Sequence, residues 1–207
     1  IAAGKSIREA LSVDKQIRDG GVSNRMHSTA NWWHEWLQPA LSAVGKIDPK
    51  YRQSFINSTM IVKSQIDKRG AVMASTDTAM LNYSRDAYAY CWPRDGAFVL
   101  WPLIRMGYTQ EAQRYFEFCR EGLHPNGYLM HKYRADGAIG SSWHPYIHDD
   151  GIIGAPIQED ETALTLFVFA QYYKMSRSRS LLDDFYLTMT NYDIHDFDRL
   201  CWAACSS

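Results

Sequence analysis

The sequence has almost no net charge. Its 22 lysines and arginines are balanced by 23 aspartates and glutamates, which leaves a formal charge of −1 over 207 residues. A protein that binds nucleic acid or an anionic membrane surface needs a large basic area, so this balance argues against both partners. No apolar run is long enough to span a bilayer, and we expect no membrane segment.

Several motifs that indicate a particular chemistry are also missing. The sequence has no glycine-rich phosphate loop and no serine nucleophile elbow. Its 4 cysteines match no zinc spacing, and disulfide frameworks belong to much smaller domains. His144 and His148 lie in a turn-rich stretch rather than on a helix, so they do not suggest a metal site. We expect neither a metal nor a cofactor.

A secretory signal peptide is absent, and the chain begins IAAGKS without a methionine. We expect the chain to be an internal piece of a longer protein. Its cellular location is therefore left open, with the cytoplasm favoured over secretion.

Aromatic residues, by contrast, are abundant. They make up 14% of the chain, with 7 tryptophans and 13 tyrosines, and the hydrophobic fraction of 46% is typical of a globular protein. Tryptophan and tyrosine offer flat apolar faces with a polar edge. Sugar-binding sites use such faces, but so do ordinary large cores, and composition alone favours the core.

Apolar residues recur at helical spacing along most of the chain. We expect helices near residues 31–45, 49–70, 95–106, 109–122, 160–173 and 180–189. Gly20-Gly21 predicts a break, Pro39 should kink or limit the first of these helices, and Thr109 should cap the fourth. The sequence therefore predicts an all-α fold.

The segments between the helices carry turn signals. Residues 71–93 have β-type content and predict irregular or short-stranded structure. Asn126-Gly127 predicts a small hairpin within a long connection at residues 123–157. Connections of that length in a compact domain are usually functional.

Arg94 and Asp95 are adjacent in an apolar and aromatic run, YCWPRDGAFVLW. Such neighbours cannot easily satisfy each other through their own side chains, and buried unpaired charges are costly. A polyhydroxylated ligand would satisfy both, because the carboxylate accepts from two hydroxyls while the guanidinium donates to a third oxygen. Ion pairs with other residues at a helix start would explain the pair equally well, so both interpretations stay open.

Three adjacent acids occur in QEDE, residues 158–161. Acids favour the positive end of the helix dipole. We favour that explanation over a catalytic role for any one of them.

Several separated motifs are similar to one enzyme family. The segment YAYCWPRDGAFVLWPLIRMGYTQEA resembles the aromatic-rich Trp-x-Arg-Asp segment of glycoside hydrolase family 15. GAVMAS before it, and GYLMHKYRADGAIGSSWHPY and PIQEDETAL after it, agree in the same order and in the prokaryotic style. The family includes glucoamylases, glucodextranases and some bacterial and archaeal trehalases. The resemblance extends from Trp32 to Tyr186.

The resemblance implies an (α/α)6 barrel, of which residues 13–190 would form the N-terminal half with a long loop between helices. Residues 1–12 resemble the last strand and exit of a β-sandwich domain that precedes the barrel in prokaryotic members. Residues 191–207 do not follow the family pattern, and whether they are native or come from an altered reading frame is left open.

The resemblance also implies a site for the non-reducing-end glucose of an oligosaccharide or of trehalose. Arg94 and Asp95 match the pair that holds this glucose, and Tyr88 aligns with a tyrosine near the hydrolytic water. Trp143 is a substitute for a tryptophan of the fungal loop. The residues implied in substrate binding are Tyr88, Trp92, Arg94, Asp95, Trp143, Gln158 and Asp160, and we expect them to converge on one concave surface.

The reaction implied is inverting hydrolysis of an α-glucosidic bond with release of glucose. It needs two carboxyl groups separated by about 6.5–9.5 Å. In the family the acid glutamate follows a tryptophan beyond the sixth helix, and the base lies later. No Trp-Glu follows residue 189 here, so we expect both catalytic glutamates to lie beyond this chain, which would then have little or no activity alone.

Two alternatives remain. The chain could be a catalytically incompetent product that keeps only the glucose-binding half of the site. It could also belong to another (α/α)6 hydrolase family, in which Glu161 is itself the general acid.

Overall fold

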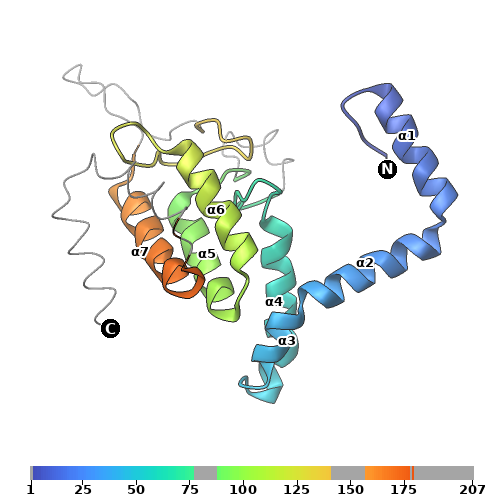
Figure 1. The fold of residues 1–207 in the computed structure, drawn as a ribbon, viewed down its shortest axis with the longest axis horizontal. Coiled ribbons are helices and arrows are strands. Elements are labelled where there is room, and N and C mark those ends of the chain that lie inside the picture. Colours follow the sequence, from blue (N-terminus) through green and yellow to red (C-terminus); the bar gives the residue numbers. More distant parts are fainter. Residues whose placement is uncertain (1, 77–87, 141–156, 178, 180–207) are drawn as a thin grey trace. The chain divides into compact units, whose positions relative to one another are not determined.

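The computed structural model describes residues 2–76, 88–140, 157–177 and 179 (Figure 1). Within these ranges the fold is helical, and β pairing is limited to isolated bridges, so the all-α prediction is confirmed. Two compact units are present: Ile1–Asn57, and a second that begins at Ser58. Several predicted features lie outside the described residues: the sixth helix, the tail 191–207, Trp143, His144 and His148. No helix in the described ranges is long and apolar enough to cross a bilayer.

The first unit begins with helix α1, Ile7–Gly20. The Ser6 side chain caps it by accepting the backbone N–H of Glu9, whose carboxylate in turn accepts from the backbone of Lys5. Residues 1–12, which resemble the last strand and exit of a β-sandwich domain, are therefore helical from Ile7 onward, because this cap begins a helix there. The predicted domain boundary after residue 12 falls inside α1, and the preceding β-sandwich stays a prediction.

The predicted glycine and proline breaks are present in this unit. Gly21 has φ of 70° and separates α1 from α2, Val22–Trp36. Leu37 separates α2 from α3, Gln38–Val44, and Pro39 lies in the first turn of α3. Proline fits the first turn because its missing N–H has no intrahelical partner there. A short 3-10 helix, Pro49–Tyr51, follows.

The next helix, α4, Arg52–Gln65, ends earlier than the predicted Gly70. The Asp67 N–H binds Ala71 O and the Gly70 N–H binds Asp67 O, so a tight turn replaces the last helical turn. Gly70 has φ of 103°, and a Cβ there would lie 2.2 Å from the carbonyl oxygen of Arg114. Only glycine permits both this conformation and this approach.

Three helices form the core of the second unit: α5, Pro93–Met106, α6, Thr109–Gly122, and α7, Glu159–Ser176. Helix α5 packs against both of the others, and most extensively against α7 (Figure 1). The rings of Phe116 and Phe169 meet edge to face with centroids 5.0 Å apart. The buried side chains include Leu100, Leu103, Ile104, Tyr115, Phe116, Cys119, Val168 and Tyr172.

The ends of these helices agree with the predicted ends to within three residues. Gly107 ends α5 in the left-handed conformation, with φ of 98°, and Pro102 lies inside that helix. The Thr109 cap is wrong by one residue, because Tyr108 occupies the cap position of α6. The tight turn at Asn126-Gly127 is present, closed by a bond from His124 N–H to Tyr128 O of 2.9 Å.

An extended segment, residues 88–92, leads into α5. Its backbone is paired on one side through Ala74 N–H to Tyr90 O, at 2.9 Å. On the other side Cys91 and Tyr133 exchange N–H to O bonds of 2.7 and 2.8 Å. Within the described parts of residues 71–93, the predicted irregular or short-stranded structure takes the form of isolated pairings. These bridges hold the segment beside residues 131–133, which are distant in sequence.

Gly96 fixes the approach of α5 to α6. A Cβ at this position would lie 2.6 Å from the ring of Tyr115, whose hydroxyl donates to Pro93 O. We expect Gly96→Ala to lower the unfolding free energy by about 1–3 kcal/mol, the usual cost of overpacking. Denaturant unfolding measures it. Gly45→Ala is the control, because no atom lies within 4 Å of its Cβ position, and an equal loss in both variants would contradict this packing role.

Candidate functional site

A pocket of about 310 Å³ opens where the extended segment meets the starts of α5 and α7. Its described lining consists of Ala74, Tyr88, Trp92, Arg94, Asp95, His131 and Gln158. Five of these were predicted from the sequence to share one concave surface. Asp160, also predicted, does not line the pocket but contacts Arg94 from α7. Trp143 lies outside the described residues.

Local sequence explains how the central segment presents its side chains. Pro93 is the first residue of α5 and forces Trp92, before it, into an extended conformation with φ of −93° and ψ of 120°. Arg94 and Asp95 then fall in the first helical turn. The chain therefore changes from extended to helical within the WPRD motif. The two charged side chains of this motif, Arg94 and Asp95, are thus placed at the start of α5.

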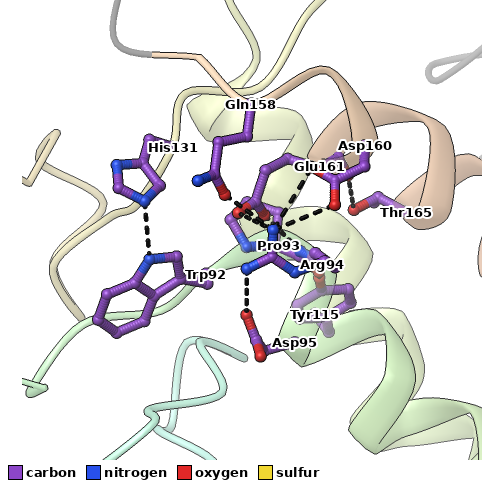
Figure 2. A network of polar contacts seen from close by, with 10 residues as sticks. All are labelled: Trp92, Pro93, Arg94, Asp95, Tyr115, His131, Gln158, Asp160, Glu161 and Thr165. Carbon is purple, nitrogen blue, oxygen red and sulfur yellow. Dashed lines mark hydrogen bonds and ion pairs between the residues drawn. The ribbon is translucent and has the colours of Figure 1, made fainter. Parts of the chain in front are cut away.

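The guanidinium of Arg94 holds the rim of the pocket together (Figure 2). Its Nη1 donates to Gln158 Oε1 at 2.8 Å and lies 3.1 Å from Asp160 Oδ2, both at the start of α7. Its Nη2 lies 3.3 Å from Asp95 Oδ2. Arg94 and Asp95 thus do contact each other, although the sequence suggested that such neighbours cannot easily satisfy each other, and Arg94 has further partners at the start of α7. For Arg94, the structure agrees with the interpretation that it forms ion pairs with other residues at a helix start.

Asp95 has hydrogen-bonding capacity left for a bound molecule. Its side chain is 57% exposed and lines the pocket. A carboxylate offers about four acceptor sites, and the contact with Arg94 uses one of them. Asp95 can therefore accept further hydrogen bonds from a bound molecule while Arg94 holds it in place.

Aromatic rings form the other wall. Tyr88 and Trp92 have ring centroids 5.9 Å apart and an interplanar angle of 35°, so two tilted faces border the polar rim. The Nε1–H of Trp92 donates to Nε2 of His131 at 3.1 Å (Figure 2). The ammonium of Lys132 lies 4.6 Å from the centroid of the Tyr90 ring and 5.3 Å from that of Trp92. Sequence reasoning missed His131 and Lys132, whose only signal was their place in the GYLMHKYRADG stretch.

Glu161 lies beneath Arg94 and is fully buried. One carboxyl oxygen accepts the backbone N–H of Arg94, and the other lies 3.6 Å from Nη1 of the same residue. Burial raises the pKa of Glu161 to about 8, although the hydrogen bond and the charge of Arg94 lower it; the charges of Asp95 and Asp160 raise it. Glu161 is not among the described lining residues of the pocket. This geometry argues against Glu161 as a general acid that touches a substrate.

The raised pKa makes a stability prediction. The folded protein keeps a proton on Glu161 that the unfolded chain releases, so the unfolding free energy falls as pH rises from 4.5 to about 8. Gln at this position cannot ionise. We expect Glu161→Gln to gain stability relative to wild type across this window, by on the order of a few kcal/mol. Glu35→Gln on α2 is the matched control, and chemical unfolding at several pH values gives the difference. A pH-independent difference for Glu161→Gln would show that this carboxyl does not titrate there.

Similarity to known proteins identifies the class of this protein. A family model described as glycosyl hydrolases family 15 matches residues 49–196, which is more than half of the chain. The chain therefore belongs to glycosyl hydrolases family 15. The described helices within the matched residues, α4 to α7, are accordingly part of an (α/α)6 barrel fold.

Two curated relatives are both named trehalase. That of Mycobacterium tuberculosis (strain ATCC 25618 / H37Rv) is 25% identical over 125 residues, which cover 58% of this chain and 18% of the relative. That of Mycolicibacterium smegmatis (strain ATCC 700084 / mc(2)155) is 27% identical over 103 residues, covering 47% and 15%. The chain thus matches less than a fifth of the length of either relative. No solved structure gives a significant match.

Proposed function

We propose that the pocket binds the terminal glucose unit of an α-glucoside, and that the chain contributes this subsite to a glycoside hydrolase. The observation that carries the proposal is the meeting of two aromatic faces, Tyr88 and Trp92, with the exposed carboxylate of Asp95 in one pocket. Aromatic faces pack against the apolar side of a sugar ring, and the carboxylate accepts from its hydroxyls. Family membership supplies the independent support.

Each polar residue has a distinct part in this proposal. Asp95 accepts hydrogen bonds from two vicinal hydroxyls, and Gln158 donates through its amide while its oxygen stays bound to Arg94. Arg94 fixes both groups, and any further donor it offers is directed to a third sugar oxygen. Asp160 holds Arg94 from α7 and has no direct contact with the glucose.

The substrate we propose first is trehalose, because both relatives reported above are named trehalase. The second candidate is a maltooligosaccharide, as for a glucoamylase, since the same terminal glucose would fill the pocket. The two substrates differ only beyond this glucose.

Hydrolysis with inversion needs two carboxyl groups on opposite sides of the bond, about 6.5–9.5 Å apart. Asp95 contributes the one carboxyl group among the described lining residues, and it is held by Arg94. We therefore place the general acid and base outside the described residues. In the same proposal residues 13–190 belong to the barrel, and this chain alone binds sugar without hydrolysing it.

The proposal is tested by titrating the chain with trehalose, maltose and myo-inositol, with heat or NMR shifts as the signal, and by assaying released glucose. We expect saturable binding of the two glucosides, no binding of inositol, and no glucose release. Absence of glucoside binding would overturn the proposed subsite. Glucose release would overturn the proposal that this chain alone binds sugar without hydrolysing it. If hydrolysis occurs, NMR of the first-formed anomer distinguishes inversion from retention.

A further inference from the structure

We propose that His131 is a positioning residue for Trp92: its neutral imidazole accepts the indole N–H and holds the ring in the pocket wall, so that ligand binding weakens when His131 gains a proton. Both side chains are 5% exposed, and both line the pocket. That the ligand is a sugar rests on the proposed function, but the hydrogen bond between Trp92 and His131 can be tested without any sugar.

The geometry determines which nitrogen of His131 carries the proton. The Trp92 indole is a donor only, and its Nε1 lies 3.1 Å from His131 Nε2. Nε2 must therefore accept, which places the proton of the neutral ring on Nδ1. The two rings meet edge to face with centroids 6.2 Å apart, and the bond crosses between segments 39 residues apart in sequence.

A second proton on His131 would remove this acceptor. Both ring nitrogens of an imidazolium are donors, so the indole N–H would then face another N–H. Trp92 would lose a buried partner and turn away, and the aromatic wall that it forms with Tyr88 would change with it. Imidazole is the ordinary side chain that can change charge between about pH 5 and pH 8, so this is the range in which the effect is sought.

The charged groups around this pair come from several elements. Lys132, next in the chain, places its ammonium 5.3 Å from the centroid of the Trp92 ring, and Arg94 on α5 lines the same pocket. Both cations oppose a further positive charge. Asp95 on α5 favours it, but is paired with Arg94 at 3.3 Å. Gln158 at the start of α7 carries no charge.

The test without sugar is nitrogen-15 NMR of the labelled chain. We expect His131 to be protonated at Nδ1 at about pH 8, and the Trp92 indole proton to shift when His131 titrates. The His131→Gln variant, which keeps an acceptor and does not titrate, should remove that pH-dependent shift. A proton on Nε2 of His131 at this pH would overturn the inference, since Trp92 could not then donate to it.

The test with sugar compares trehalose affinity at about pH 8 and pH 5. In wild type we expect the Kd to rise about fivefold at the lower pH, the scale of one hydrogen bond. His131→Phe should show the weaker affinity at both pH values, and His131→Gln near wild-type affinity at both. His34→Gln on α2 is the control and should keep the wild-type profile.

The outcomes separate this inference from the proposed function. A flat wild-type profile, or a wild-type profile in His131→Gln, would overturn the inference while the pocket still binds sugar. No binding by wild type at either pH would overturn the proposed function, and the NMR experiment would then decide whether His131 holds Trp92. If His131→Phe does not fold, the test is made with His131→Gln and with the NMR measurement of the His131 tautomer.

Discussion

Asp95→Asn is expected to raise the Kd for trehalose by on the order of 10²-fold, or about 2.7 kcal/mol, with little change in stability. The substitution keeps the size of the side chain and one acceptor oxygen but removes the charge. Charge-assisted hydrogen bonds are about twice as strong as neutral ones. Because the side chain of Asp95 is 57% exposed and lines the pocket, its charge is available to a ligand rather than used in the core. Titration calorimetry or NMR gives the Kd.

The melting temperature, measured on the same preparation, separates binding from structure. If Asp95 served only as an ion-pair partner of Arg94, the variant would melt lower and bind trehalose normally. Asp14→Asn on α1 is the matched control, since Asp14 forms an exposed pair with Arg18 at 2.7 Å. We expect it to leave the Kd unchanged. Normal affinity in Asp95→Asn would contradict the proposed role of Asp95.

Arg94→Met is expected to destabilise the protein in a pH-dependent way. The guanidinium lies 3.6 Å from a buried oxygen of Glu161, so its removal raises the pKa of Glu161 still further above its ordinary value. At about pH 5 Glu161 is protonated in both proteins, and we expect a loss of about 1–2 kcal/mol from the missing hydrogen bonds. At about pH 9 the carboxyl group of Glu161 is buried without its ion-pair partner, and we expect a larger loss of about 3–5 kcal/mol.

The sign follows from proton binding. A folded-state pKa raised above the unfolded value removes stability as pH increases, and a larger shift extends the loss to higher pH. The double variant Arg94→Met/Glu161→Gln should therefore lose the pH dependence and be more stable than Arg94→Met at about pH 9. Arg18→Met is the control for an exposed pair. A loss for Arg94→Met that is equal at both pH values would contradict the coupling of Arg94 to Glu161.

Helix ends were predictable because short local signals determine them. Gly107 ends α5 through a left-handed cap, as predicted, whereas α5 begins at Pro93, two residues before the predicted start. The end of α4 was predicted five residues too late, because Gly70 serves a close approach to Arg114 rather than a helix cap. That approach joins segments distant in sequence, so no local pattern contains it.

The same distinction applies to the site. The WPRD motif and its resemblance to one family predicted the residues of the central segment and of the start of α7. The contacts that organise them were not predictable, since Trp92 binds His131 from 39 residues away and Arg94 binds Glu161 from 67 away. A single histidine or acid has no spacing rule that identifies such a partner. Pairing across a fold is decided by packing, which the periodicity of one sequence does not encode.

The most direct test of the central claim is residue-resolved NMR of the labelled chain during titration with trehalose. The account predicts saturable shifts of the Trp92 indole proton and of the amides of Asp95 and Gln158, all with one Kd. It also predicts that the same shifts are lost in Asp95→Asn. No saturable shift at these three residues, or shifts that persist unchanged in the variant, would contradict the assignment of this pocket as a glucose-binding site.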